Sequence, residues 1–325
     1  MAASPEPRPV RPRLLVAEPD RFSGRAVEIL RRAAEVELRH ARGAELRDAF
    51  ARYDVVWIRL GQRIDAAILG AHPRCRFLVA GVTGLDHIDL DACAERGIEV
   101  VSLRGEVDFL RDVRATAELT VGLLVSLVRQ IPAAAEHVRA GGWDRDRFRG
   151  RELFGKTAGL VGVGRLGTQV ARILAAFGMR VIGHDPRPDF PEDVAERCDS
   201  LAALLSASDV VSLHVSYGPG TRHLIGRAEL LLMKPGAVLV NTSRGGVVDE
   251  TALLDALAEG RLMGAALDVL EGEPDLAPDH PVRRALAGLP NLLVVPHIGG
   301  NTVESLEKTE TFLAERVAAL LVARA

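Results

Sequence analysis

The chain has few of the sequence features that indicate a disulfide framework, a zinc site or a membrane protein. Its 325 residues include only three cysteines, Cys75, Cys93 and Cys198, and their odd number and wide spacing argue against disulfides and zinc. No apolar run approaches the roughly 20 residues that a spanning helix needs, and the chain does not start with a signal-peptide core. We therefore expect a soluble, cytoplasmic protein with no metal and no membrane partner.

An excess of charge of one sign is also absent. Lysine and arginine number 41 and aspartate and glutamate 44, so the net charge of -3 creates no basic field for nucleic acid. The 48% hydrophobic content is ample for globular cores, and the length corresponds to about two domains. These properties favour a small-molecule partner. Residues 1–11, with prolines at 5, 7 and 9, predict a flexible leader.

Apolar runs alternate with helical patterns along the first hundred residues. This alternation predicts right-handed crossovers and a parallel α/β sheet, which we expect to be flavodoxin-like. The expected strands are RLLVAEP (13–19), DVVWIRL (54–60), RFLVAGV (76–82) and IEVVSL (98–103). A helical pattern without interruption follows from 116 to 140 and ends at Gly141 and Gly142.

A second alternating series then predicts a Rossmann-type, doubly wound dinucleotide-binding domain. Its six expected strands are TAGLVGVG (157–164), MRVIGHD (179–185), DVVSLHV (209–215), AVLVNTS (237–243), MGAALDV (263–269) and NLLVVPH (291–297). A last helical pattern covers 302–323 and must pack back on the first domain. The expected division is a substrate domain of 12–114 plus 299–325 and a dinucleotide-binding domain of 115–298.

A glycine motif opens the second series. Gly162, Gly164 and Gly167 form G-x-G-x-x-G between a strand pattern and a helix pattern, the context in which this motif binds a pyrophosphate. Asp185 ends the next strand, where a carboxylate would bind the ribose hydroxyls and repel a 2′-phosphate. We expect NAD rather than NADP, although Arg187 could blunt that preference. The alternative is a turn without a ligand and an acid that caps a helix.

Three polar residues follow apolar runs of the second series. Because the carboxyl ends of parallel strands open on the ligand crevice, Arg244, Glu273 and His297 are expected to meet there. Hydride transfer to a carbonyl group leaves negative charge on its oxygen, so it needs a proton donor, and a substrate carboxylate would need a cation. His297 is the candidate donor, Glu273 would fix its tautomer and favour its charged form, and Arg244 would hold the substrate. A surface ion pair and a core histidine are the structural alternatives.

Over nearly its whole length the chain resembles the D-isomer-specific 2-hydroxyacid dehydrogenase family. Five motifs carry the resemblance, in the order and at the spacing that the family has. They are GLVGVGRLG, HDP, VNTSRGGVVDETAL, GAALDVLEGEP and PHIGGNT. The resemblance implies a substrate domain around a central nicotinamide domain, a homodimer built largely from the nucleotide domains, and an NAD-dependent oxidoreductase. Since the sequence ends at Ala325, we also expect no C-terminal regulatory domain of the kind that some relatives carry.

The resemblance implies further site residues. Those expected at the cofactor are Arg165 and Leu166 at the pyrophosphate, Thr242 and Ser243 by the nicotinamide ribose, Asp268 at the carboxamide, and Gly299 and Gly300 through their backbone. His214, which ends a strand of this domain, is also expected near the cofactor. Those expected at the substrate are Thr83, Gly84 and Leu85 at its carboxylate and Arg59 at its distal end, with a solvated arginine as the alternative for Arg59.

Two questions stay open at this point. The substrate ranges from glyoxylate to hydroxypyruvate, phosphohydroxypyruvate and bulkier keto acids, and the connection over 103–115, which is longer than usual, could tune the choice. A second class of function, a non-catalytic NAD(H)-responsive binding protein of corepressor type, uses the same fold. Turnover of 2-keto acids with NADH distinguishes the two.

Overall fold

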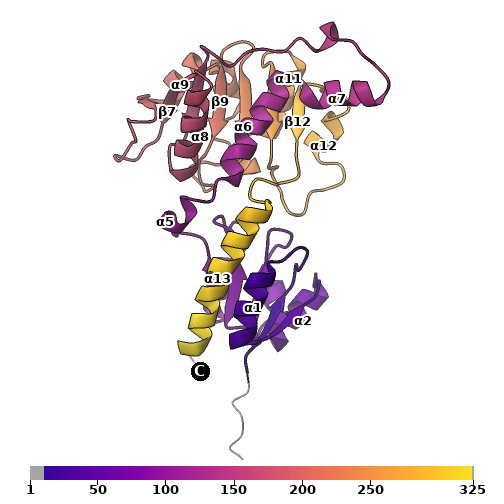
Figure 1. Ribbon diagram of the computed structural model, residues 1–325, viewed down its shortest axis with the longest axis vertical. Coiled ribbons are helices and arrows are strands. Elements are labelled where there is room, and N and C mark those ends of the chain that lie inside the picture. The colour runs from indigo at the N-terminus through magenta and orange to yellow at the C-terminus, as the bar shows by residue number, and fades with distance from the viewer. Residues whose placement is uncertain (1–10, 324–325) are drawn as a thin grey trace, which may run out of the picture. The chain divides into compact units, whose positions relative to one another are not determined.

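The computed structural model describes residues 11–323. The described chain divides into two compact units, one of residues 11–110 and 303–323 and the other of residues 111–302 (Figure 1). The sequence pattern predicts crossings at 114/115 and 298/299, each four residues from the divisions at 110/111 and 302/303. The leader expected over 1–11 lies outside the described residues except for Arg11.

The first unit is built on a five-stranded parallel sheet of order β2-β1-β3-β4-β5. This is the strand order of flavodoxin-like folds, so the expected fold class is confirmed. The strands are β1 (Arg13–Val16), β2 (Glu35–Leu38), β3 (Val55–Ile58), β4 (Phe77–Ala80) and β5 (Glu99–Ser102). The helices are α1 (Gly24–Ala33), α2 (Ala44–Arg52), α3 (Ala66–Leu69), α4 (Leu90–Glu95), α5 (Val107–Leu110) and α13 (Val303–Ala323).

The C-terminal helix α13 belongs to this first unit. It lies along α1, as Figure 1 shows, and it also contacts β5. Its buried residues include Leu313, Ala314 and Val317, which provide the apolar stripe that a helix needs to pack on a domain. The end of the chain therefore completes the domain that the beginning of the chain starts.

The second unit is a seven-stranded parallel sheet of order β12-β11-β10-β9-β6-β7-β8. Counted from β6, this is the Rossmann order 3-2-1-4-5-6 with one further strand, which confirms the doubly wound class. The strands are β6 (Thr157–Val161), β7 (Arg180–His184), β8 (Glu196–Arg197), β9 (Val210–Leu213), β10 (Val238–Asn241), β11 (Gly264–Leu267) and β12 (Leu292–Val294).

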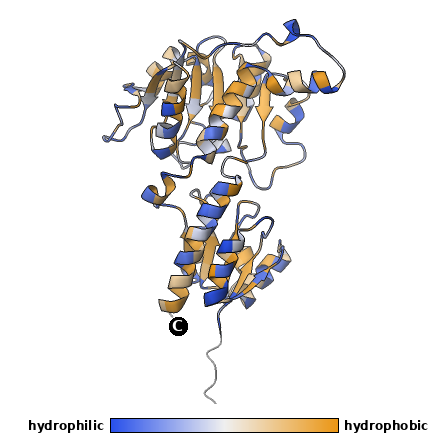
Figure 2. Ribbon diagram, in the orientation of Figure 1, coloured by the Kyte–Doolittle hydropathy of each residue, from blue (hydrophilic) through white to orange (hydrophobic). Residues whose placement is uncertain are grey.

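Both faces of this second sheet are covered. Successive residues alternate between two apolar clusters, so that Leu160 and Val240 pack on one face while Val161 and Leu239 pack on the other. Strands buried on both faces have continuous apolar sequences, which appear in Figure 2 as hydrophobic arrows. The helices are α6 (Ala115–Val128), α7 (Ile131–Arg139), α8 (Arg165–Ala176), α9 (Leu201–Ala207), α10 (Arg227–Leu232), α11 (Glu250–Ala258) and α12 (Pro281–Ala285), with 3-10 turns η1 (Asp146–Phe148) and η2 (Gly245–Val247).

The prediction of one uninterrupted helix over 116–140 is wrong. The helix breaks between α6 and α7, where Gln130 adopts a left-handed conformation with φ 52°. Pro132 explains the break, because its ring would clash with the carbonyl four residues earlier and it has no N–H to donate. The two helices differ in burial, since seven residues of α6 are buried and none of α7 is.

Among residues 11–323, no single helix has both the length and the apolar composition to cross a membrane. One pair, 107–128 with 131–139, meets those criteria only together, and it is bent by 63°.

The sequence analysis does not predict the helices α2 and α12, and three further elements are also additional to the expected ones. The strands β2 and β8 lie at the sheet edges and carry charges, Glu35 and Glu37 in one and Glu196 and Arg197 in the other. Edge strands need no continuous apolar run, which is why their sequences do not indicate strands. The third is α5, a single helical turn within the long connection of 103–115.

Candidate active site

The glycine turn between β6 and α8 has the geometry of a phosphate-binding loop. Gly162 has φ +89°, and a Cβ there would lie 2.7 Å from the carbonyl oxygen of His214. A Cβ at Gly167 would lie 2.2 Å from the oxygen of Gly162, so the helix packs directly on the turn. A Cβ at Gly164 would meet only the Arg187 guanidinium, at 3.8 Å. The first and third glycines thus permit the close packing, and the second leaves space for a ligand to approach the backbone.

The residues after this turn fit a pyrophosphate. The helix α8 begins at Arg165 and its first turn has no side-chain cap, which leaves N–H groups for an anion. The Arg165 guanidinium donates to the Val113 carbonyl at 3.2 Å, and burial lowers its pKa. Leu166 packs instead on the apolar cluster between α6, α8 and the sheet.

Asp185 lies directly after β7 and is buried. Its Oδ2 accepts from the Val163 N–H at 2.9 Å, within the glycine turn, and its Oδ1 accepts from Arg187 N and Nε at 3.0 Å. Burial raises the pKa of the carboxyl, but the hydrogen bonds from Arg187 and Val163 outweigh that effect and lower it. The group is therefore an anion placed against the phosphate loop, with an arginine paired to it.

His214 follows β9 and lies against the glycine turn. Burial lowers the pKa of its imidazole to about 4, so the ring is neutral at physiological pH. Its Nε2 lies 2.9 Å from the Ser212 hydroxyl, while the buried Nδ1 makes no hydrogen bond with the part of the chain that the structure describes.

The segment after β10 is organised by Asn241. Its Oδ1 accepts from the N–H of Ser243 at 3.0 Å and from the hydroxyl of Ser243 at 2.8 Å, and its Nδ2 donates to the Arg244 carbonyl at 2.9 Å. Thr242 is held from the other side, because its hydroxyl lies 2.7 Å from that of Thr120 in α6. Asn241 therefore fixes the backbone that carries Arg244, a role that its position in a strand does not reveal.

Arg244, Glu273 and His297 follow three neighbouring strands. Asn241, Leu267 and Val294 are in register across β10, β11 and β12. Arg244 and His297 each lie three residues beyond these paired residues. The parallel sheet therefore brings both to the carboxyl ends of its strands. The Arg244 guanidinium donates from Nη1 to the Ser243 carbonyl at 2.8 Å.

His297 and Glu273 form a pair. The His297 Nδ1 lies 2.5 Å from Glu273 Oε2, and Glu273 Oε1 accepts from the Leu270 N–H at 2.6 Å. Because a carboxylate only accepts hydrogen bonds, this contact assigns a proton to Nδ1 and directs the Nε2 side of the ring away from Glu273. Both side chains are about a fifth exposed, at 23% and 22%.

The backbone of His297 is strained. Its φ of 51° is left-handed, which a non-glycine residue adopts only where the surroundings impose it. The His297 N–H donates to the Asp268 carbonyl at 2.8 Å, and the Asp268 carboxylate accepts from Ile298 N at 2.6 Å and from Gly299 N at 2.9 Å. Burial raises the pKa of that carboxyl against the effect of these N–H groups. Asp268 thus holds the turn that presents the imidazole.

The two glycines of this turn differ. Gly299 is buried, and a Cβ there would lie 2.8 Å from Asp268 Oδ2, whereas Gly300 is exposed and has open space around it. Close packing explains a glycine at 299.

Gly245 is a site residue that the sequence analysis missed. A Cβ at this position would lie 1.9 Å from the carbonyl carbon of Leu270 and 2.1 Å from the nitrogen of Glu271. The segment of Arg244 therefore packs backbone to backbone on the segment that leads to Glu273. Only the chain's path in space reveals this contact, although the double glycine after Arg244 is a signal that a backbone approaches.

Arg59 is paired with an acid of the C-terminal helix. Its Nε donates to Glu310 of α13 at 3.1 Å, its Nη2 donates to the same carboxylate, and its Nη1 donates to the Asp20 carbonyl at 2.7 Å. Burial raises the pKa of Glu310, and the Arg59 guanidinium opposes that rise. In the structure the Arg59 guanidinium is thus an ion-pair partner of Glu310.

The loop of Thr83, Gly84 and Leu85 follows β4. Thr83 is exposed, Gly84 is half-buried, and Leu85 is buried. The side chain of Leu85 belongs to the core of the first unit, so a contact with a ligand there would use the backbone.

Among residues 11–323, no group of three or more His, Cys, Asp or Glu side chains is arranged to hold a metal ion. Two features of this site are typical of nicotinamide-dependent oxidoreductases. One is a glycine turn beside an acid, and the other is an imidazole that is paired with a glutamate and follows a strand of the same sheet as the arginine.

Comparisons with known proteins identify the family. Residues 121–299 match the model of the D-isomer specific 2-hydroxyacid dehydrogenase, NAD binding domain. The chain belongs to this family, which confirms the resemblance of its motifs and the binding of NAD(H).

Individual relatives cover most of the chain. It is 35% identical to a hydroxypyruvate reductase of Thermotoga maritima over 92% of this chain and 95% of that protein. It is 38% identical to a D-3-phosphoglycerate dehydrogenase of Methanocaldococcus jannaschii over 95% of this chain, which spans 57% of that longer protein. The crystal structure of D-lactate dehydrogenase from Aquifex aeolicus, complexed with NAD and lactic acid, superposes with a TM-score of 0.82 at 29% identity and covers 95% of each chain.

Proposed function

We propose that this chain catalyses the NAD(H)-dependent interconversion of a D-2-hydroxy acid and its 2-keto acid. The observation that carries the proposal is the 2.5 Å contact between His297 Nδ1 and Glu273, at the sheet edge that also carries Arg244. Gly162, Gly164, Gly167 and Asp185 would hold the cofactor, together with His214, Thr242, Ser243, Asp268, Gly299 and Gly300. When bound, NADH supplies a hydride.

Each polar residue has one role in reduction. Negative charge develops on the carbonyl oxygen of the keto acid, and a proton from His297 Nε2 neutralises it. Glu273 keeps a proton on Nδ1 and stabilises the imidazolium, so the ring can donate from its other nitrogen. Arg244 presents a planar fork of donors to the substrate carboxylate.

A panel of 2-keto acids with NADH tests this function. We expect turnover, with loss of NADH absorbance that depends on both the enzyme and the keto acid. Tight NADH binding without turnover of any keto acid would instead support the alternative, an NAD(H)-responsive binding protein.

We propose a small keto acid such as hydroxypyruvate or glyoxylate as the substrate. The support is the reductase of Thermotoga maritima, which this chain matches over 95% of that protein's length, and a glyoxylate reductase of Aeropyrum pernix at 39% identity over 82% of this chain. The backbone of the loop of Thr83, Gly84 and Leu85 would bind the substrate carboxylate. In the panel, both compounds should then have a higher kcat/KM than branched keto acids.

We propose NAD(H) as the preferred cofactor because the Asp185 carboxylate would repel a 2′-phosphate. Asp185→Asn is expected to raise the ratio of kcat/KM for NADPH to that for NADH about 10- to 100-fold, since Arg187 then lacks its anionic partner and can bind the phosphate. Asp189→Asn, at an exposed acid 3.9 Å from the same guanidinium, is the control and should change the ratio little. An unchanged ratio in Asp185→Asn would refute the assignment.

We also propose a homodimer in which α7 and the chain after it form part of the interface. None of the residues of α7 is buried, and Trp143 and Phe154 beyond it are 89% and 76% exposed. In Figure 1 this segment projects from the side of its unit. Large contiguous apolar patches are typical of association surfaces, and we propose that these side chains contribute to one.

Analytical ultracentrifugation tests the dimer. The wild-type chain should sediment at twice its monomer mass, and the double variant Val138→Glu with Trp143→Glu should raise the dimer dissociation constant at least about 10-fold, because two charges would be buried. Val322→Glu, at an exposed apolar residue of α13, is the control. A wild-type monomer at micromolar concentration would exclude the dimer.

We propose a reducing compartment, the cytoplasm, for the protein. Cys75, Cys93 and Cys198 are all free, and burial raises the pKa of the Cys75 thiol to about 12 and that of Cys93 to about 11. Such thiols stay protonated and unreactive.

A further inference from the structure

A buried glutamate, Glu250, is hydrogen-bonded to the turn that leads to Glu273. Glu250 is the first residue of α11 and is only 7% exposed. Its Oε1 accepts from the Glu271 N–H at 2.7 Å, and its Oε2 lies 3.3 Å from His280 Nε2. Burial raises the pKa of this carboxyl, against the effect of the Glu271 N–H. Burial of a carboxyl group costs free energy of folding unless hydrogen bonds compensate for it. The contacts of Glu250 therefore indicate a specific role.

The hydrogen bonds of Glu250 lead directly to the proposed proton donor. The N–H of Glu271 is held by Glu250, and the preceding N–H, that of Leu270, is held by Glu273 at 2.6 Å. The other oxygen of Glu273 contacts His297 Nδ1 at 2.5 Å. Two successive amides of one turn are thus bound by two glutamates, one buried in α11 and one paired with the imidazole.

The same turn also contacts the segment of Arg244. The Glu271 carboxylate lies 2.9 Å from His223 Nε2, and the His223 N–H donates to the Gly246 carbonyl at 2.8 Å. Gly245 packs on the Leu270 backbone so closely that a Cβ would lie 1.9 Å from its carbonyl carbon. A shift of the turn would therefore disturb both the acid that orients His297 and the segment that carries Arg244.

We propose that Glu250 is a positioning residue, which fixes the peptide between Leu270 and Glu271 and thereby the orientation of Glu273 toward His297. Its oxygen acts as a hydrogen-bond acceptor at a set position, and its charge is not required. This inference rests on the proposed dehydrogenase function. Misplacement of a catalytic group by about 1 Å lowers turnover by as much as about 100-fold, so even a small retraction of the acceptor should be measurable.

Two conservative variants separate position from charge. Glu250→Gln keeps an oxygen at the same distance from the Glu271 N–H, and its kcat should stay within about 3-fold of wild type. Glu250→Asp keeps the charge but withdraws the carboxylate by one methylene, and its kcat should fall about 10- to 100-fold. The Kd for NADH should change less than about 3-fold in both, because the glycine turn and Asp185 lie on other elements.

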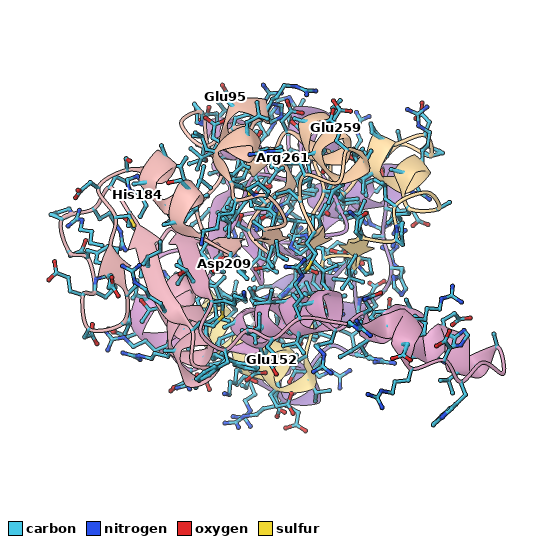
Figure 3. All side chains as sticks on the ribbon, turned by 90° about the horizontal axis from the view of Figure 1, so that it is seen from above. Glu95, Glu152, His184, Asp209, Glu259 and Arg261 are labelled. Atoms are coloured by element: carbon cyan, nitrogen blue, oxygen red, sulfur yellow. The ribbon has the colours of Figure 1, made fainter. Side chains whose placement is uncertain are left out.

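Glu259→Gln is the matched control, since this glutamate follows the same helix α11 and is exposed (Figure 3). The opposite pattern, in which Glu250→Asp is active and Glu250→Gln is not, would show that the charge matters and would overturn the proposal. Equal kcat values in all variants, or losses that follow only thermal stability, would overturn it as well. A wild-type chain that binds NADH but turns over no keto acid would instead refute the proposed function itself.

Discussion

His297→Asn is expected to lower kcat for keto-acid reduction about 10²- to 10⁴-fold, the range that a positioned general acid contributes. Asparagine is the sharpest replacement because it tolerates the left-handed backbone that His297 adopts, with φ 51°. Its short amide can still meet Glu273, but it offers no titrating nitrogen on the substrate side. The Kd for NADH, measured by fluorescence, should stay within about 3-fold of wild type because the glycine turn is untouched.

The control for this variant is His40→Asn. His40 also lies beside a carboxylate, Asp20 at 3.1 Å, but both are exposed. Its substitution should leave kcat unchanged. If His297→Asn retained more than a tenth of the wild-type kcat, the imidazole would not be the proton donor.

Arg244→Lys should lower kcat/KM for the keto acid about 10²- to 10³-fold, which corresponds to about 3–4 kcal/mol of transition-state binding. Lysine keeps the charge, but it cannot present the planar fork that binds a carboxylate through two parallel hydrogen bonds. The loss should be larger than any change in the Kd for NADH. Steady-state kinetics with saturating NADH measure it.

Arg227→Lys provides the comparison, because Arg227 is an exposed arginine paired with Asp255 at the surface. Surface pairs of this kind contribute little, and kcat/KM should be unaffected. If the Arg244→Lys enzyme had the wild-type kcat/KM, the guanidinium would not bind the substrate carboxylate, and its contact with the Ser243 carbonyl would be only structural.

The central sheet and the polar residues at the carboxyl ends of its strands could be predicted because of one physical property. Parallel strands buried on both faces require continuous apolar runs, so β10, β11 and β12 are visible in the sequence, and the polar residue after each run marks the carboxyl edge. Edge strands such as β2 and β8 carry charges instead and do not stand out.

The supporting contacts could not be predicted, because they join segments that are distant along the chain. Arg59 has an ion-pair partner 251 residues away in α13, and nothing in the sequence near Arg59 indicates Glu310. In the same way, Glu250 accepts from an N–H 21 residues later, across a strand and a turn. Periodicity places a residue on an element, but the packing of the elements decides what its side chain contacts.

Transfer of deuterium from C4-deuterated NADH to a keto acid tests the central claim most directly. The keto acid is hydroxypyruvate, or another that the panel shows to react, and the NADH carries deuterium on the face of C4 from which the hydride is transferred. Mass spectrometry should then find one deuterium at C2 of the product for each NADH consumed. Chiral chromatography should find only the D-2-hydroxy acid. NADH oxidation without deuterium at C2, or an L-configured product, would contradict the proposed reaction.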